Sequence, residues 1–507
     1  MELFELDGFG DVAAEDDAVL SYFLSTKAVS AVEGGSALMV LGRKGTGKTA
    51  LVRYFTSGER RATSRPLNLR GYPWNVHALR TDSGASEVEA YVSSWRYFLA
   101  VQLASIALTL PGAFGLAEAA ELNKFLQDNY GGPNPALGEI LKPKRLRFSK
   151  ILVSPSVLGN GLGGFEMEGR GRDVSFGLEL SGLSTALVDN ALACIQRCGN
   201  KPISLHFDEL DQGITALDQQ RRTMLIGLVL AARELKRESA EKGTPVRPVV
   251  YLRSDLWDEL QFSDKNKITQ SASLLLEWTS ANLKDVINLR LRTKLGGDRN
   301  WDAIDDANLM RGSRQKWSHI VNRTFLRPRD AISFLNQALE IAKLRDPGVL
   351  KFTNADIQGA REPYSTYLKS ELDDEIGPHW RDWTEALQAC SAIGTEQFQR
   401  EEFVEEYGRR QSKHNQVAAD DALELLYRFS VIGYRVGVGG GGSSWVFKYA
   451  EPKSGYDSVA KRFKVHPGLK EFAKLREMRT AGDTISWDEL SEEQVRDLLY
   501  LPPTDQS

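Results

Sequence analysis

The chain has 507 residues, of which 42% are hydrophobic and 26% charged, and its 64 Lys and Arg residues nearly balance 68 Asp and Glu residues. This composition predicts a globular protein of two or three domains and excludes one that attracts polyanions over its whole surface. The three cysteines are too few for a disulfide framework and are not spaced like zinc ligands, so a reducing, cytoplasmic location is expected.

The sequence predicts neither a secretion signal nor a membrane-spanning helix. The first 20 residues are acidic, whereas a secretory signal is basic and then apolar. The longest apolar stretch, Trp95 to Leu110, is shorter than the roughly 18 residues needed to cross a bilayer. We therefore expect a buried helix at Trp95 to Leu110 and no membrane partner.

A glycine-rich loop follows the first apolar segment. Ala37 to Leu41 predicts a buried parallel strand, and Ala50 to Phe55 has helical character. The sequence between them, GRKGTGKT, is the full GxxxxGK[ST] pattern, in which backbone amides and a helix N-terminus face phosphate groups. The predicted nucleotide-binding residues are Gly42, Arg43, Lys44, Gly45, Thr46, Gly47, Lys48, Thr49 and Ala50.

The roles within such a site follow from its chemistry. Lys48 is predicted to reach the β- and γ-phosphates, and the Thr49 hydroxyl is predicted to bind Mg²⁺. A second apolar strand, Ile203 to Phe207, ends in Asp208 and Glu209. Asp208 is the predicted second metal ligand, because Mg²⁺ prefers hard oxygen atoms. Glu209 is placed to orient or deprotonate the attacking water, which favours hydrolysis over binding alone.

These residues resemble the bacterial stand-alone P-loop ATPases of the AAA+ and STAND-related group, which have an origin-recognition-like core, a lid and a winged helix. The marks are Phe9-Gly10, Ala14-Glu15 and the loop from Gly42 to Leu51. The resemblance covers residues 5 to 345 and implies ATP as the nucleotide. It implies an α/β fold with a P-loop parallel sheet, flanking helices, a helical lid and a C-terminal winged-helix-like domain.

The resemblance also implies two sensors of the γ-phosphate. Val249 to Asp255 looks like a core strand that carries the first, on Arg253 or Ser254, and Arg253 is the residue we select.

The second implied sensor lies in Phe325 to Asp330, at the start of a lid helix. Pro328 suits a first helical turn, so Arg327 or Arg329 could project toward the nucleotide. Arg329 is the residue we select, and the alternative is that both arginines pair with Asp330 or other local carboxylates.

About 160 residues separate Thr49 from Asp208, which indicates an insertion within the core. Two helices are predicted there, Trp95 to Leu110 and Leu116 to Tyr130. The alternation between Phe165 and Leu180 predicts a β-hairpin, so the preceding GxGxxG is not a dinucleotide site, because it lacks the following helix. The basic run Lys142 to Lys150 could contact a nucleic-acid backbone or be a solvated loop.

Two helical patterns, Gln397 to Arg410 and Val417 to Phe429, precede a hairpin pattern around four consecutive glycines. This is the element order of a winged helix, and His466 is predicted to begin a closing helix. The second helix carries Asp420, Asp421 and Glu424, whose carboxylates would meet phosphates in a major groove. We therefore favour a protein contact or an intramolecular regulatory role over DNA binding.

The predicted organisation has six segments. They are the N-terminal part of the ATPase core (1–84), an insertion of helices and a β-hairpin (85–195), the remainder of the core (196–290), the helical lid (291–384), the winged-helix-like domain (385–480) and a tail (481–507).

The first functional hypothesis is an ATP-hydrolysing switch of the AAA+/STAND type that couples nucleotide state to a protein partner or to self-association. By resemblance, its setting would be bacterial defence or stress. The alternative is a DNA-binding AAA+ loader or remodeller that uses the winged helix and the cations Lys144, Arg145 and Lys448. A scaffold that never hydrolyses nucleotide is disfavoured by Glu209.

Overall fold

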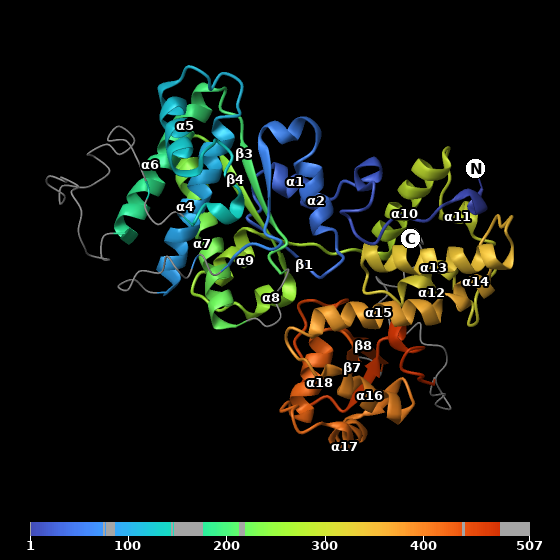
Figure 1. Cartoon of the computed structure of the whole chain (residues 1–507). Coiled ribbons are helices and arrows are strands. Elements are labelled where there is room, and N and C mark those ends of the chain that lie inside the picture. Colours follow the sequence, from blue (N-terminus) through green and yellow to red (C-terminus); the bar gives the residue numbers. More distant parts are fainter. Residues whose placement is uncertain are drawn as a thin grey trace, which may run out of the picture. The chain divides into compact units, whose positions relative to one another are not determined.

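The computed structural model describes residues 2–74, 77, 87–142, 146, 176–211, 218–438 and 442–476. The chain forms two compact units, which are described separately (Figure 1). The core unit comprises Ser25–Arg43 and Lys48–Leu276, and the helical unit comprises Met1–Leu24, Lys44–Gly47 and Glu277–Ser507.

A five-stranded parallel sheet forms the centre of the core unit. Its order is β2-β3-β4-β1-β5, so β4 separates β1, which leads into the glycine-rich loop, from the acid-tipped β3. The strands are β1 (Met39–Gly42), β2 (Ser64–Asn68), β3 (Ile203–Asp208), β4 (Val246–Arg253) and β5 (Ser273–Leu275). The predicted parallel α/β sheet is confirmed.

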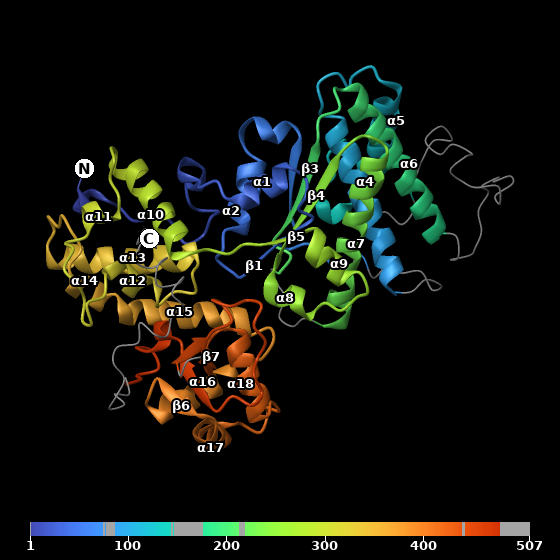
Figure 2. The same cartoon turned by 180° about the vertical axis from the view of Figure 1, so that it is seen from behind.

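Helices cover both faces of this sheet, as parallel strands require. In both views α1 and α2 lie on one side, and α4 and α7 lie on the other (Figures 1 and 2). The helices are α1 (Lys27–Glu33), α2 (Lys48–Phe55), α4 (Glu87–Ala107), α5 (Ala117–Tyr130), α6 (Phe176–Arg197), α7 (Gln219–Glu241), α8 (Ser254–Glu259) and α9 (Lys265–Ser271), with short 3-10 turns at Gly58–Ala62 and Leu137–Glu139.

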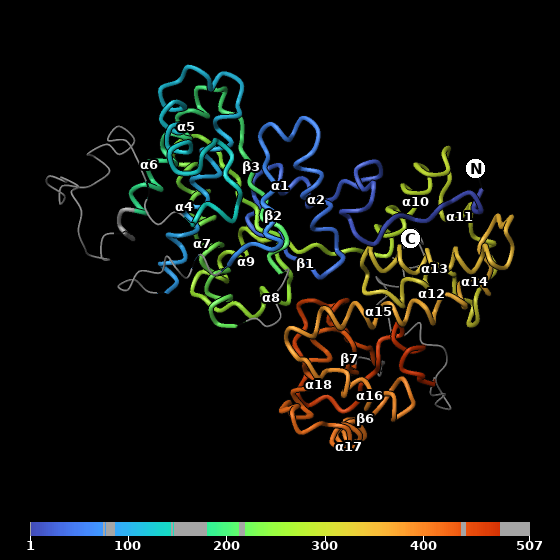
Figure 3. Tube along the Cα trace, in the orientation of Figure 1, coloured from blue at the N-terminus to red at the C-terminus, as the bar shows by residue number. Residues whose placement is uncertain are grey.

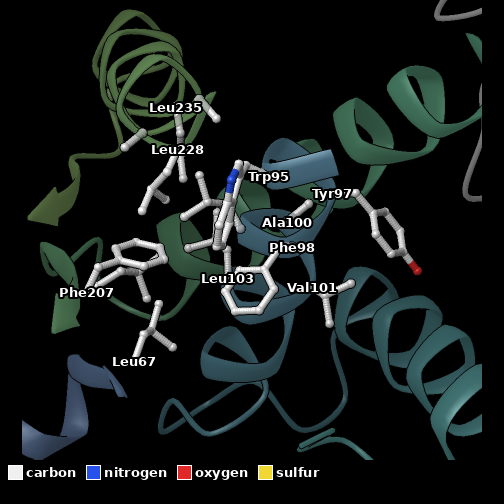
Figure 4. Close-up of a cluster of buried hydrophobic side chains, with 14 of the residues drawn as sticks. Leu67, Trp95, Tyr97, Phe98, Ala100, Val101, Leu103, Phe207, Leu228 and Leu235 are labelled. Atoms are coloured by element: carbon white, nitrogen blue, oxygen red, sulfur yellow. The ribbon is translucent and has the colours of Figure 1, made fainter. Parts of the chain in front are cut away.

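Helix α4 is buried on nearly every side, which explains its continuous apolar sequence. Trp95 and Phe98 face Leu67 and Phe207 of the sheet (Figure 4), and the Trp95 indole donates to the Met224 carbonyl of α7 at 3.0 Å. The predicted buried helix is thus confirmed. Among the described residues, no helix combines the length and apolar character that crossing a bilayer needs.

The insertion is helical where the structure describes it. The chain is already in α6 at Phe176, so the hairpin prediction is wrong for Phe176 to Leu180. The reason is that buried apolar residues recur three or four positions apart along this helix, at Leu180, Leu183, Leu187 and Ala191. The remainder of the hairpin, the GxGxxG segment, and the basic run apart from Lys142 and Leu146 lie outside the described residues.

The helical unit begins with an extended N-terminal segment that runs beside α10 and α13 (Figure 3). Phe9 is fully buried, its amide donates to the Asn336 side chain at 2.8 Å, and its carbonyl accepts from Arg290 at 2.7 Å. Gly10 has φ +116°, and a Cβ there would lie 1.8 Å from the Arg290 guanidinium. The Phe9-Gly10 motif therefore anchors the N-terminus to this unit.

The lid region consists of packed helices, with Pro328 in the first turn of α13 as predicted. The helices are α10 (Ser280–Leu295), α11 (Trp301–Ile304), α12 (Lys316–Val321), α13 (Pro328–Arg345), α14 (Asn354–Gly359) and α15 (Arg361–Ile376), with 3-10 turns at Leu3–Glu5 and Val19–Tyr22.

The C-terminal module has the winged-helix-like order helix, strand, helix, helix, hairpin. Its elements are α16 (Trp383–Ile393), β6 (Gln397–Gln399), α17 (Arg400–Arg410), α18 (Ala419–Arg428), β7 (Ile432–Val438), β8 (Gly442–Val446), β9 (Arg462–Val465) and a 3-10 turn at Pro467–Leu469. The antiparallel sheet has the order β6-β9-β7-β8. The predicted closing helix at His466 is wrong. In the described residues up to 476 a 3-10 turn forms there instead, and a Cβ at Gly468 would clash with the Arg323 carbonyl.

His206 of β3 is a fully buried core residue, as predicted. Its Nδ1 lies 3.0 Å from the Tyr251 hydroxyl, and its ring stacks on Phe55 of α2. Burial lowers the pKa of His206 to about 3 from its ordinary 6.5. Only the unfolded chain takes up this proton between those values, so stability is lost as pH falls below 6.5.

Because of this histidine, the free energy of unfolding should fall by about 2 kcal/mol between pH 7 and pH 5. His206→Gln should remove that part of the pH dependence in denaturant titrations at the two pH values. The exposed His414→Gln is the matched control. An unchanged slope in His206→Gln would show that the histidine is charged in the fold.

Candidate functional site

The glycine-rich loop joins β1 to α2, as the motif predicts. Gly42 is the last residue of β1, and Lys48 is the first residue of α2. Gly45 and Gly47 have φ values of +83° and +96°, which glycine adopts without a steric penalty. The core unit contains the predicted residues Gly42, Arg43, Lys48, Thr49 and Ala50, and the helical unit contains Lys44 to Gly47.

The Lys48 side chain folds back over the start of its own loop. Its ammonium donates to the carbonyls of Gly42 at 2.9 Å and Arg43 at 3.0 Å. Burial lowers the pKa of Lys48, while the nearby carboxylates of Asp211 and Asp208 act in the opposite direction. Lys48 is therefore held at the acidic edge of the sheet, where a phosphate would be a strong additional partner.

Asp208 at the end of β3 contacts the other predicted metal ligand. Its carboxylate accepts hydrogen bonds from the Thr49 hydroxyl and from the Glu209 amide. Burial raises the pKa of Asp208, and these two hydrogen bonds and Lys48 lower it. Thr49 and Asp208, which are 159 positions apart in the sequence, thus lie in contact, as a shared metal site would require.

Glu209 has an unusual backbone conformation. Its φ is +59°, in the left-handed region, and only 6% of the residue is exposed. This conformation costs a non-glycine residue about 1–2 kcal/mol, and such strain persists where the surrounding structure fixes it, often at functional sites. In this conformation the Glu209 amide donates to the Asp208 carboxylate.

Arg253 is the last residue of β4 and pairs in register with Gly42 of β1. Its guanidinium makes two hydrogen bonds to Asp255, at 3.0 and 2.7 Å, and lies 3.7 Å from Asp211. Arg253 also lies close enough to Lys48 to lower its pKa. Of the two residues implied as the first sensor, Arg253 is therefore the one held at this edge, and Ser254 begins α8.

Two acidic residues of the site, Asp211 and Asp255, were not singled out from the sequence. Each follows a strand end by two or three positions, which is the signal that could have indicated them. Thr49 and Asp208 supply a hydroxyl and a carboxylate oxygen, the ligand types that Mg²⁺ prefers. In the part of the chain that the structure describes, no group of three or more His, Cys, Asp or Glu residues forms a separate metal site.

In the helical unit, α15 and α13 contact the middle of the loop. The Lys44 ammonium lies 2.6 Å from Asp374 and 3.5 Å from Glu371 of α15. The Trp278 indole donates to the Thr46 carbonyl at 3.0 Å. Three side chains of this unit therefore fix the loop between Lys44 and Thr46.

Arg327 is almost completely buried and serves two carboxylates. It pairs with Asp330 at 2.8 Å and with Glu375, and it donates to the Lys44 carbonyl at 2.9 Å. Burial opposes its charge, but Asp330 and Glu375 raise the pKa of Arg327 well above its ordinary value. Arg327 thus pairs with carboxylates, as in the alternative to a sensor role.

Arg329 also contacts the loop. Its backbone amide points to the Gly45 carbonyl at 3.5 Å, and its side chain donates to the Val12 carbonyl at 3.0 Å and pairs with Glu371 at 3.2 Å. Arg329 is thus adjacent to Gly45, and its side chain is held by Val12 and Glu371, so pairing with carboxylates describes both arginines.

The chain was compared with known proteins. Residues 281–373, from α10 into α15, match the model of a FunZ-associated C-terminal helical domain. The chain is similar in structure to the Aeropyrum pernix Orc1 protein, solved in complex with DNA, with 14% identity, a TM-score of 0.33, and coverage of 88% of this chain and 90% of that one. No curated protein matches the sequence.

The two loop glycines should tolerate alanine differently. A Cβ at Gly45 would lie 2.9 Å from the Arg329 Cβ, whereas no atom of the residues that the structure describes would lie within 4 Å of a Cβ at Gly47. Both substitutions carry about 1 kcal/mol of backbone strain, and Gly45→Ala should cost about 1–3 kcal/mol more through overpacking. Denaturant unfolding of the two variants measures the difference, and equal costs would contradict the close approach of Arg329.

Substitution of the two lid arginines, Arg327 and Arg329, should lower the free energy of unfolding by different amounts. Arg327→Met leaves Asp330 and Glu375 buried without their cation and should cost about 3–5 kcal/mol of unfolding free energy. Arg329→Met removes a partly exposed pair and should cost about 1 kcal/mol or less. Thermal or denaturant unfolding without nucleotide is the measurement. A stable Arg327→Met protein would argue against this assignment.

Proposed function

We propose that the chain binds ATP with Mg²⁺, hydrolyses it, and acts as a switch of the AAA+/STAND type. The observation that carries this proposal is the hydrogen bond from the Thr49 hydroxyl to the Asp208 carboxylate, with Lys48 beside them. A strand-loop-helix with this sequence and an acidic strand end at the same edge support a magnesium-bound triphosphate.

Each residue has a distinct task in this proposal. The amides from Gly42 to Ala50 cradle the phosphates, and Lys48 exchanges the carbonyls of Gly42 and Arg43 for phosphate oxygens. Thr49 and Asp208 hold Mg²⁺, which neutralises phosphate charge when it is bound. Glu209 orients the attacking water and accepts its proton.

Arg253 and Arg329 are the proposed sensors. Arg253 lies at the acidic edge near Lys48, and Arg329 lies against Gly45. Each is now paired with carboxylates, Asp255 for Arg253 and Glu371 for Arg329, so phosphate would compete with those partners. Each arginine would thus pair with its carboxylate when no nucleotide is bound and with phosphate when nucleotide is bound.

The proposed output is a change in the helical unit that a protein partner or a second copy of the chain detects. The loop is one covalent segment whose middle contacts α15 through Lys44, Glu371 and Asp374. Movement of the loop on nucleotide binding would thus change its contacts with α15. Because α15 directly precedes α16, this change could reach the C-terminal module. By resemblance, the setting would be bacterial defence or stress.

The rival function, a DNA-binding AAA+ loader or remodeller, has weaker support in its original form. Lys144 and Arg145 lie outside the described residues. Lys448 donates to the carbonyls of Pro452 at 2.6 Å and Ser454 at 3.1 Å, so it holds its own loop. Helix α18 carries Asp420, Asp421 and Glu424. A DNA contact would need another surface.

Steady-state ATP hydrolysis tests the proposal. Lys48→Ala should lose nucleotide binding, because it removes the ammonium that is proposed to contact the β- and γ-phosphates. Glu209→Gln should retain ATP binding and lose about 10²–10⁴-fold in turnover, which is the usual contribution of a general base. Fluorescent-ATP titration and phosphate release measure the two steps separately.

Hydrogen exchange of the Glu209→Gln protein with and without ATP tests the coupling to α15. Exchange of α15 should change when ATP binds, and Lys48→Ala should show no change at the same ATP concentration. ATP binding that survives Lys48→Ala would refute the site. Full turnover by Glu209→Gln would refute the role of that carboxylate.

A further inference from the structure

The C-terminal module is polarised in charge. Its helices α17 and α18 carry an excess of acidic residues: Glu401, Glu402, Glu405, Glu406, Asp420, Asp421 and Glu424, against Arg400, Arg409, Arg410 and Arg428. A polyanion would be repelled by this helical side. The opposite side of the module is the outer face of its four-stranded sheet.

Strand register defines the residues of that outer face. Arg435 of β7 lies opposite Trp445 of β8, and Gly433 of β7 lies opposite Lys464 of β9. Directly opposite residues share a face, and alternate residues along a strand do so too. The outer sheet face therefore comprises Gln397, Gln399, Gly433, Arg435, Gly437, Ser443, Trp445, Arg462 and Lys464.

The intervening residues confirm this orientation. Phe398, Phe463, Tyr434 and Val446 are buried, and the Phe398 ring stacks on Phe403 of α17. The helices thus cover the inner face of the sheet. Arg435, Arg462 and Gly437 on the other face are exposed.

The outer sheet face is cationic. It carries Arg435, Arg462 and Lys464 and no acidic residue, although Glu396 at its edge lies 4.0 Å from Lys464. Tyr434 of β7 pairs with Phe463 of β9, and the two strands are antiparallel. Arg435 therefore lies opposite Arg462 on the adjacent strand. In the described part of the chain neither arginine has an ion pair. Like charges so placed are unfavourable unless an anion lies near them.

An aromatic ring stands among these cations. Trp445 is partly exposed, and the Lys464 ammonium lies 5.7 Å from its ring centroid. The Arg435 side chain is oriented by a 2.8 Å hydrogen bond from its Nε to the Ser443 hydroxyl. No atom of the described residues would lie within 4 Å of a Cβ added at Gly437, so they leave the strand surface there uncovered. A flat ligand can therefore approach the backbone beside the indole.

We propose that the outer sheet face binds single-stranded nucleic acid. An unpaired base stacks on Trp445, while Arg435 and Arg462 contact the phosphates on either side of it. This combination of a basic surface with an aromatic platform is how single strands are bound without sequence preference. A duplex fits less well, because its bases are already stacked and do not present a free ring face to a flat sheet. An acidic protein segment would match the arginines but would leave the indole and the exposed backbone at Gly437 unused.

The test uses the full chain without nucleotide and a fluorescein-labelled 15-nucleotide oligothymidylate, followed by anisotropy. Trp445→Ala should weaken binding by roughly ten-fold or more. The double variant Arg435→Ala/Arg462→Ala should lower the slope of log affinity against log salt concentration by about 1.4, since each phosphate contact contributes about 0.7 for single strands. Trp445→Phe keeps a stacking ring and should bind nearly as well as the wild type.

The matched control is Arg409→Ala, an exposed arginine on the acidic side that pairs with Glu405 and Glu406. It should leave binding unchanged. Thermal unfolding of each variant separates lost contacts from lost structure. The inference is overturned if the sheet variants bind like the wild type, if Arg409→Ala weakens binding equally, if duplex DNA binds as tightly as the single strand, or if polyglutamate of equal charge competes as well.

This inference stands on the C-terminal sheet alone. Lys48→Ala should bind the oligonucleotide with wild-type affinity, so the result does not depend on the nucleotide site. Failure of ATP hydrolysis and failure of oligonucleotide binding are therefore distinguishable outcomes.

Discussion

The hydrogen bond between the Thr49 hydroxyl and the Asp208 carboxylate joins α2, the helix that follows β1, to β3, a strand that is not a neighbour of β1. Strand β4 lies between β1 and β3, so the loop and the start of α2 must reach across it. That reach places Lys48, Asp208, Asp211 and Arg253 at one buried edge. Burial then acts against both signs of charge, lowering the pKa of Lys48 and raising that of Asp208, and their mutual attraction opposes both effects.

The middle of the same loop is contacted by a buried arginine that two carboxylates surround. In the helical unit Arg327 is a buried cation between Asp330 and Glu375, and it also binds the Lys44 carbonyl. Its charge is fully used by its neighbours, which favours a positioning role for Arg327 over direct recognition of phosphate. Arg329 is partly exposed and, among the described residues, pairs with a single carboxylate, Glu371, so its charge is less enclosed than that of Arg327. The same short motif thus provides one structural arginine and one candidate for sensing.

Much of the candidate site could be predicted because the chemistry of a phosphate-binding loop fixes residue types at fixed spacing. The loop from Gly42 to Thr49 and the acidic end of β3 were both found in this way. What could not be found depends on distant contacts. Glu375 as the partner of Arg327 lies 48 positions away, and no local pattern indicates it. Strand β9 was missed because its alternation of polar and apolar residues extends over four positions, too few to stand out, and Phe176 to Leu180 alternate like a strand while the fold needs a helix there.

The winged-helix-like order of elements does not by itself decide which surface meets a partner. The acidic residues of α18 argue against insertion of that helix into DNA, and from the sequence alone they favour a protein partner. The register of the sheet changes the conclusion, because it gathers Arg435, Arg462, Lys464 and Trp445 from three strands onto one face. Residues that are 10 to 29 positions apart along the chain become neighbours there. An acidic helix and a basic sheet in one small module are therefore consistent with each other, since they face opposite sides.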